Sequence, residues 1–234
     1  MKLPVVAIDG PAGAGKTTVS QRVADALGYT LVDTGALYRS VALAAKEANV
    51  DWDDAEGVGR VAERLAREHS IRFGSSAPGQ RRIYLGERDV SEAIRAADIS
   101  QGASRVSALP SVRAALLEMQ RSAGEGGGVV LEGRDIGTVV FPSAEAKFFL
   151  TANVEVRARR RHEELRAKGT AAELAEVARE VAERDKRDSS RPIAPLRQAD
   201  DATVVDSSEL GIDEVVRLIV SRVEEVAKAL NPPA

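Results

Sequence analysis

A glycine-rich turn near the amino terminus constrains the fold of this chain more than any other stretch. Residues 10–17 read GPAGAGKT, which fits G-x-x-x-x-G-K-[ST], between an apolar run at 5–9 and a helical pattern at 16–27. Glycines let successive backbone N–H groups point inward, so the turn can surround an anion at the start of a helix. The pattern therefore predicts a loop that binds the phosphates of a nucleoside triphosphate.

Each part of this loop has an expected role. Lys16 would place its ammonium over the β- and γ-phosphates, and the hydroxyl of Thr17 would ligate Mg²⁺. We therefore expect ATP and Mg²⁺ as cofactors. The strand before the turn and the helix after it disfavour the alternative of a plain connecting turn. The residues expected to contact the nucleotide are Gly10, Pro11, Ala12, Gly13, Ala14, Gly15, Lys16, Thr17 and Thr18.

Short apolar runs alternate with longer helical patterns along the chain, which is typical of parallel βαβ units. Nearly continuous apolar runs indicate strands that are covered on both faces. The expected strands are 5–9, 30–33, 128–132, 147–151 and 202–206. The expected helices are 16–27, 36–48, 111–122, 154–168, 171–186 and 213–230. The pattern predicts an α/β fold with helices on both faces of a parallel sheet.

One segment interrupts this alternation. Residues 71–73 and 82–85 are strand-like and flank a cluster of Gly, Ser and Pro, and a second turn follows at 86–87. We expect a small antiparallel meander over 71–94, inserted into the α/β pattern. The alternative is a surface loop without a role.

Composition and charge exclude several classes of protein. The 234 residues carry a net charge of −3, which is too balanced to indicate binding to nucleic acid or to a membrane surface. There is no cysteine, which excludes disulfides and thiolate metal sites. No apolar run is long enough to span a bilayer, and the first residues lack the pattern of a signal peptide. We expect a cytoplasmic protein, and a monomer.

Further candidate anion sites follow the second and third strands. Residues 33–39 read DTGALYR, which predicts the start of a helix. Its first backbone N–H groups could bind an anion, and Arg39 would lie about one turn further along the helix. Arg134 and Asp135 follow the third strand, at the sheet edge where open α/β sheets bind their ligands. The alternatives are a capped helix with a surface arginine and a structural ion pair.

Two clusters of basic residues lie in the carboxyl-terminal half. Three arginines share one helical face at i, i+3 and i+4: Arg157, Arg160 and Arg161. A second face carries Arg184, Asp188 and Arg191. A solvated charged face is the usual explanation of such runs. Phosphoryl transfer explains them better, because its transition state spreads negative charge that arginines stabilise, and a closing lid excludes water.

Two absences restrict the class of reaction. The chain has no N-K-x-D-like reader of guanine, and the third strand ends in Glu132 and Gly133 without the aspartate expected of a typical ATPase. Both weigh against a GTPase switch or a motor. Candidate phosphate sites with two arginine clusters favour a kinase whose acceptor is itself phosphorylated.

Longer stretches of the sequence resemble bacterial cytidylate kinases, nucleoside monophosphate kinases that phosphorylate CMP and dCMP. The resemblance runs from about residue 5 to residue 206. It is carried by AIDGPAGAGKTT, DTGALYRSVALAA, LGERDVSEAIR, ALPSVRAALLEMQR, EGRDIGTVVFP and RDKRDSSRPIAPL. It implies an adenylate-kinase-like P-loop NTPase fold with a five-stranded parallel sheet of order 2-3-1-4-5. The implied domains are a core at 1–40, 105–152 and 190–234, a monophosphate-binding insertion at 41–104, and a lid at 153–189.

The resemblance also implies roles for residues. Lys16 and Arg184, with the lid arginines Arg157, Arg160 and Arg161, would stabilise the transferring phosphate. The acceptor phosphate would be held by Thr34, Arg39, Arg134 and Arg191. The cytosine edge would be read by Ser104, Arg113 and Asp135, and the ribose would be held by Arg184 and Asp188. The assignment suits cytosine, because its exocyclic amine needs an acceptor and its O2 and N3 need donors.

Two positions depart from the family pattern. Ala12 stands where the family often has serine, which removes one hydroxyl from the loop, and Thr34 stands where serine is common. Neither change disturbs the interpretation. The alternatives are a kinase for another small acceptor, such as UMP or dephospho-coenzyme A, and a P-loop switch protein that yields no product.

Overall fold

The computed structural model describes residues 2–77, 80–167, 169 and 171–232. The chain forms two compact units, each described by itself below. The first comprises residues 1–31 and 126–234, and the second comprises residues 32–125.

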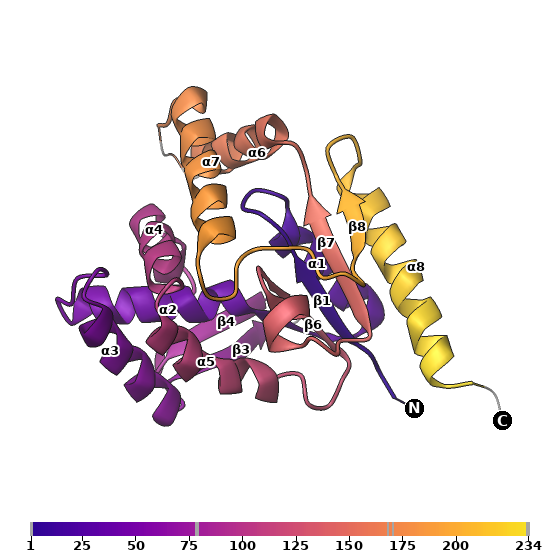
Figure 1. The fold of residues 1–234 in the computed structure, drawn as a ribbon, viewed down its shortest axis with the longest axis horizontal. Helices are drawn as coiled ribbons and strands as arrows, with labels where there is room; N and C mark the ends of the chain where they lie inside the picture. Colours follow the sequence, from indigo (N-terminus) through magenta and orange to yellow (C-terminus); the bar gives the residue numbers. More distant parts are fainter. Residues whose placement is uncertain (1, 78–79, 168, 170, 233–234) are drawn as a thin grey trace. The chain divides into compact units, whose positions relative to one another are not determined.

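A five-stranded sheet forms the centre of the first unit (Figure 1). Its strands are β1 (Val5–Asp9), β2 (Thr30–Asp33), β6 (Val129–Gly133), β7 (Ala146–Thr151) and β8 (Thr203–Asp206). Their spatial order is β2-β6-β1-β7-β8, and β1 runs parallel to both β6 and β7. When these five strands are numbered 1 to 5 in chain order, their spatial order is 2-3-1-4-5. The predicted strand order is therefore confirmed.

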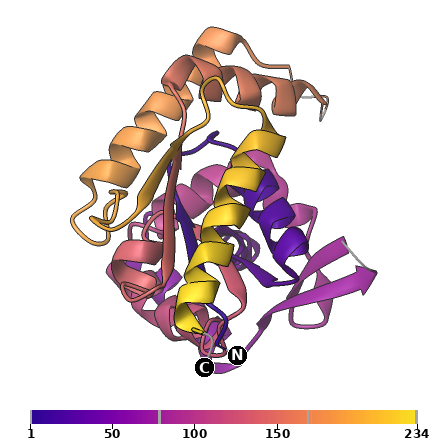
Figure 2. The same cartoon turned by 90° about the vertical axis from the view of Figure 1, so that its right-hand side faces the viewer.

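Two helices cover one face of this sheet. They are α1 (Lys16–Leu27) and α8 (Ile212–Leu230), and Figure 2 shows α8 lying along the strands. Val6 and Ile8 of β1 pack with Val19 of α1 and Ile219 of α8 in one buried apolar cluster. Because side chains alternate along a strand, Ala7 and Asp9 lie on the opposite face.

The segments after β6 and β7 complete the first unit. A five-residue π-helix, η2 (Ile136–Val140), follows β6. Helices α6 (Val154–Ala167) and α7 (Leu174–Ser190) follow β7 and pack on each other through Leu165, Val177 and Val181. Helix α7 continues beyond the predicted end at 186, so Asp188 lies in its last turns.

The second unit combines helices with a small antiparallel sheet. The helices are α2 (Thr34–Glu47), α3 (Ala55–Arg67), the short 3-10 helix η1 (Ala93–Arg95), α4 (Ala97–Val106) and α5 (Pro110–Ser122). The sheet has the order β3-β4-β5, with β3 (Ile71–Ala77), β4 (Gln80–Leu85) and β5 (Arg88–Asp89). The meander expected over 71–94 is therefore confirmed, although β3 runs through much of the expected turn cluster. Residues 78–79 of that cluster lie outside the described residues.

Most helix and strand positions agree with the sequence expectations, but the α-helices α3 and α4 and the short helices η1 and η2 were missed. Helix α3 contains Gly57 and Gly59, which lower helix propensity, and α4 begins without a side-chain cap. Both helices are held by packing in the apolar cluster of the second unit, to which they contribute Val58 and Ile99. The two units also divide the chain differently from the expected core, insertion and lid, and that functional division stays a prediction.

Candidate active site

The glycine loop connects β1 to α1 in the first unit. Helix α1 begins at Lys16, directly after Gly15, which has a φ of 86°. Gly13 has a φ of 76°, and a Cβ there would stand 2.9 Å from the carbonyl oxygen of Arg157. Only glycine fits this close approach, so the loop lies directly against the first turn of α6.

The side chain of Lys16 is buried within the loop. Its Nζ donates a hydrogen bond to the carbonyl oxygen of Pro11 at 2.7 Å. Burial lowers the pKa of the Lys16 ammonium well below its ordinary value, and the nearby guanidinium of Arg134 lowers it further. A bound polyphosphate would favour the charged ammonium, so the site is built to receive negative charge at this atom.

The oxygens beside Lys16 suit a small divalent cation. The hydroxyl of Thr17 donates to Oε2 of Glu132 at 3.2 Å, and Glu132 is buried at the end of β6. Magnesium favours oxygen ligands and is held by one or two protein groups together with substrate phosphates. Thr17 fits that requirement as a ligand, with Glu132 as the acceptor that orients its hydroxyl. No group of three or more His, Cys, Asp or Glu that could hold a metal occurs in the described part of the chain.

Glu132 is a residue that sequence reasoning undervalued. From the sequence, Glu132 marks only the place where an ATPase aspartate is missing, whereas the structure places its carboxylate against Thr17. The sequence did contain a signal, because Glu132 is an acidic residue at the carboxyl end of a buried strand. Open α/β sheets bind their ligands at that edge.

A group of charged side chains connects the residue after β6 with the last turns of α7. Asp188 accepts from Nε of Arg134 at 2.9 Å and lies 4.0 Å from Nε of Arg184. Burial alone would raise the pKa of Asp188, but Arg134, Arg184 and Arg191 together hold that pKa below its ordinary value. The carboxylate therefore stays ionised and organises three arginines.

A second buried ion pair adjoins this group. Nη2 of Arg191 donates to Oδ1 of Asp135 at 3.3 Å, and both side chains are about 5% exposed. The Nε of Arg191 donates to the carbonyl oxygen of Ala194, which fixes the chain after α7. The structure thus brings the predicted residues of the 134–135 and 184–191 segments together.

The three lid arginines all have partners within the protein. Arg157 donates to the carbonyl oxygens of Ala152 at 2.8 Å and Ala12 at 3.0 Å, and it forms an ion pair with Asp185 at 2.6 Å. The remaining two bind Ser207 and Glu164: Arg160 donates to both oxygens of Ser207, and Arg161 pairs with Glu164. Arg157 is therefore a buried connection between the glycine loop, α6 and α7.

The other predicted substrate residues belong to the second unit. Arg39 pairs with Asp33 at 2.6 Å, and Asp33 also caps α2 by accepting from the backbone N–H of Ala36. Thr34, the first residue of α2, is buried.

The predicted base-reading residues of the second unit are also buried. The guanidinium of Arg113 lies over the ring of Tyr38, 5.6 Å from its centroid, and donates to the carbonyl oxygen of Ser107. The hydroxyl of Ser104 has no hydrogen-bond partner among the described residues. A buried hydroxyl without a partner is costly, and a ligand that supplies one would relieve that cost. Tyr38 was not predicted, because a ring contact across two helices leaves no local sequence signal.

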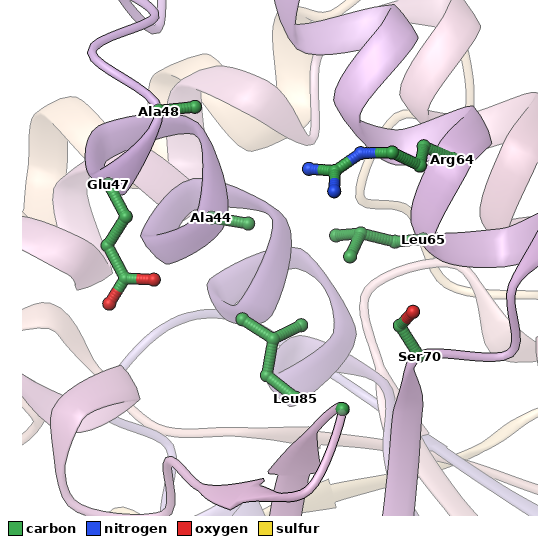
Figure 3. A pocket seen from close by; sticks show the side chains of 8 residues that line it. Ala44, Glu47, Ala48, Arg64, Leu65, Ser70 and Leu85 are labelled. Carbon is green, nitrogen blue, oxygen red and sulfur yellow. The ribbon is translucent and has the colours of Figure 1, made fainter.

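The second unit also has a surface pocket of about 380 Å³, shown in Figure 3. Arg64 and Leu65 of α3 line one side, and Ala44, Glu47 and Ala48 of α2 line the other. Glu47 is already paired with Arg88. The lining includes none of the predicted site residues, so this pocket has no part in the proposed chemistry.

The parallel sheet, its glycine loop and the arginine-rich segments define a P-loop phosphotransferase. A sequence model of the cytidylate kinase family matches residues 6–225. The chain belongs to the cytidylate kinase family.

Individual relatives agree with this assignment. The chain is 49% identical over 228 residues to a cytidylate kinase of Syntrophotalea carbinolica, covering 97% of this chain and 95% of that one. It is 47% identical over 220 residues to a cytidylate kinase of Pelotomaculum thermopropionicum, covering 94% and 96%.

A solved structure of an uncharacterized protein from Eubacterium ventriosum is similar in fold. Its TM-score is 0.51 at 11% identity, covering 94% of this chain and 98% of that one. Among the described residues, none of the helices is long and apolar enough to cross a membrane.

Proposed function

We propose that this protein transfers the γ-phosphoryl group of ATP to the phosphate of CMP or dCMP. An oxygen of the acceptor phosphate forms a bond to the γ-phosphorus, and the bond from that phosphorus to the β–γ bridging oxygen breaks. The products are ADP and the cytidine diphosphate. The observation that carries the proposal is the buried Lys16 within the glycine loop, next to the arginines organised by Asp188.

The glycine loop and Lys16 would bind and orient the donor. Backbone N–H groups of the loop and the start of α1 favour negative charge, and Lys16 can exchange its bond to Pro11 for a phosphate oxygen. The hydroxyl of Thr17, oriented by Glu132, would ligate Mg²⁺, which when bound neutralises charge on the donor phosphates. No side chain has to act as a general base, because the acceptor phosphate is already anionic near neutral pH.

The arginines would serve the acceptor and the transferring group. We propose that Arg134 and Arg191, with Thr34 and Arg39, bind the acceptor phosphate, and that Arg184 and Asp188 bind the ribose. Arg184 and a lid arginine (Arg157, Arg160 or Arg161) would stabilise charge on the transferring group. For a lid arginine, contact with phosphate would require exchange of its present protein partner.

Recognition of the base would depend on complementary hydrogen bonding. Asp135 can accept from the exocyclic amine of cytosine, while Ser104 and Arg113 can donate to its O2 and N3. Uracil would present a carbonyl to the carboxylate of Asp135 in place of that amine. A site of this kind rejects the wrong base because its buried polar groups would stay unpaired.

A direct test is formation of nucleoside diphosphate from ATP and Mg²⁺, with CMP, dCMP, UMP, AMP and GMP offered side by side. We expect turnover mainly with CMP and dCMP. Turnover with UMP or AMP instead would overturn the base assignment but keep phosphoryl transfer. Binding of ATP without transfer to any acceptor would contradict the proposed reaction and favour a P-loop switch protein.

A further inference from the structure

The π-helix η2 follows directly on Asp135, the residue proposed to read the base. π-Helices are rare and occur often at functional sites. The carbonyl oxygen of Asp135 accepts from the backbone N–H groups of Val139 at 2.9 Å and Val140 at 3.2 Å. The position of η2 therefore determines where the backbone of Asp135 lies.

The amino-terminal end of η2 is bound by Asp9 of β1. Oδ1 of Asp9 accepts from the backbone N–H of Ile136 and Oδ2 accepts from that of Gly137, both at 2.8 Å. The Asp9 side chain is buried, so its two oxygens replace water as partners of these N–H groups. Asp9 is also the residue before Gly10, and one side chain thus connects the start of the glycine loop to η2.

The segment just after η2 is bound by Lys147 of β7. Nζ of Lys147 donates to the carbonyl oxygen of Pro142 at 2.5 Å and to the carboxylate of Asp201 at 2.8 Å. In the register of β1 and β7, Ala7 lies beside Lys147, so Lys147 and Asp9 are on the same face of the sheet. A Cβ on Gly137 would stand 3.2 Å from Cδ of Lys147 and 3.5 Å from Oδ2 of Asp9. The helix therefore lies in close contact with both side chains.

The two charges match the polarity of the segment that they hold. The carboxylate of Asp9 accepts from the backbone N–H groups of Ile136 and Gly137, and the ammonium of Lys147 donates to the carbonyl oxygen of Pro142, so each charge meets backbone groups of opposite polarity. We propose that Asp9 and Lys147 are positioning residues that hold η2 and the segment just after it, and so keep Asp135 in place to read the base of the acceptor. This role rests on the proposed function, and in it neither residue is assigned a contact with substrate.

The test compares Michaelis constants for the acceptor and for ATP in variants of the full chain. We expect Asp9→Asn and Lys147→Met to raise the KM for CMP about 10- to 100-fold, as for a displaced positioning group, with the KM for ATP changed less than about twofold. Lys147→Arg keeps the positive charge, so its KM for CMP should stay close to that of the wild type. Asp201→Asn is the matched control, because it removes only the exposed partner of Lys147.

Backbone amide hydrogen exchange gives a second readout that does not depend on activity. Asp9→Asn should accelerate exchange at Ile136 and Gly137 at least about tenfold, while the strand amides of β6 keep their protection. An active Asp9→Asn protein with an unchanged KM for CMP would overturn the positioning role alone, as would equal increases in both Michaelis constants. A wild-type protein without CMP turnover would overturn the proposed function and this role together, even where the exchange result shows that Asp9 holds η2.

Discussion

Arg157 donates a hydrogen bond from Nη1 to the carbonyl oxygen of Ala12, inside the glycine loop, at 3.0 Å. The same nitrogen lies 2.6 Å from Oδ2 of Asp185 on α7. Arg157, which is predicted from the sequence to be a lid arginine, thus binds the backbone of the glycine loop. This relationship predicts that changes at Arg157 affect nucleotide binding and stability together.

Arg157→Ala should lower the free energy of unfolding by about 2–3 kcal/mol, because it leaves the partly buried carboxylate of Asp185 without this ion pair. The KM for ATP should rise as well, since the carbonyl of Ala12 loses its donor. Urea unfolding and steady-state kinetics measure the two effects. Arg179→Ala is the control, because it removes only an exposed ion pair on α7 and should change the free energy by less than about 0.5 kcal/mol. Equal effects of the two changes would contradict the role of Arg157.

Lys16→Met should lower kcat about 10²- to 10³-fold, because it removes the cation placed to stabilise charge on the transferring phosphate. The apolar side chain suits the buried position, so we expect the protein to fold. The measurement is the rate of ADP formation at saturating ATP and CMP. Lys46→Met is the matched control, since Lys46 is an exposed lysine paired with Asp98. Retention of most activity by Lys16→Met would remove Lys16 from the mechanism.

Glu132→Gln should raise the Mg²⁺ concentration for half-maximal activity about tenfold, a typical effect of losing an outer-shell partner of a metal ligand. The reason is that the hydroxyl of Thr17 loses the carboxylate that orients it. Titration with Mg²⁺ at fixed ATP measures the shift, and binding of Mn²⁺ in the presence of ATP, followed by electron paramagnetic resonance, gives an independent value. Glu209→Gln, at an exposed carboxylate in the loop before α8, should leave both unchanged. An unshifted Mg²⁺ requirement in Glu132→Gln would show that this carboxylate does not orient Thr17.

The sequence was sufficient for the sheet and for the glycine loop. Buried parallel strands are continuous apolar runs, which locates them, and the loop pattern is local. Helix α3 was missed because its glycines argue against a helix, and the packing of Val58 overrides that propensity. The π-helix η2 was missed because its backbone is held by Asp9, which lies 127 positions before Ile136 in the sequence.

The sequence indicated several residues of the candidate site, but not how they pair. Residues at the carboxyl ends of parallel strands converge on one edge, so Arg134 and Asp135 could be chosen from position, whereas Lys16 was chosen from the glycine-loop pattern. Which carboxylate binds which arginine depends on how α7 returns toward the sheet. The hydrogen bond between Arg157 and Ala12 spans 145 positions, and no local pattern indicates it.

Asp135→Asn should reduce the preference for CMP over UMP at least about tenfold, measured as the ratio of the two kcat/KM values. The amide can donate to the carbonyl of uracil where the carboxylate can only accept. Asparagine also keeps an oxygen for Arg191, which avoids leaving that buried guanidinium without an acceptor. The KM for ATP, measured in the same assays, is the internal control. An unchanged preference would remove Asp135 from recognition of the base.

The stability of the protein should depend on pH through Asp9. Burial raises the pKa of Asp9 to about 6 from 3.8, against the opposing effect of the N–H groups of Gly137 and Ile136. The folded protein therefore binds this proton more tightly than the unfolded chain does. The resulting stabilisation is fully present below pH 3.8 and is lost as the pH rises through about 6.

Asp9→Asn removes the ionisable carboxyl group, so a comparison of the wild type with this variant isolates the pH dependence that is due to Asp9. The free energy of unfolding of the wild type, minus that of Asp9→Asn, should fall by about 2 kcal/mol between pH 4 and pH 7. Urea unfolding at several pH values measures this difference. Asp206→Asn is the matched control, because Asp206 also ends a strand but is exposed, and the pKa of Asp206 is lowered by hydrogen bonds from Ser208. A difference that stays constant or grows over this range would show that burial does not raise the pKa of Asp9, since only a raised pKa gives a loss with increasing pH.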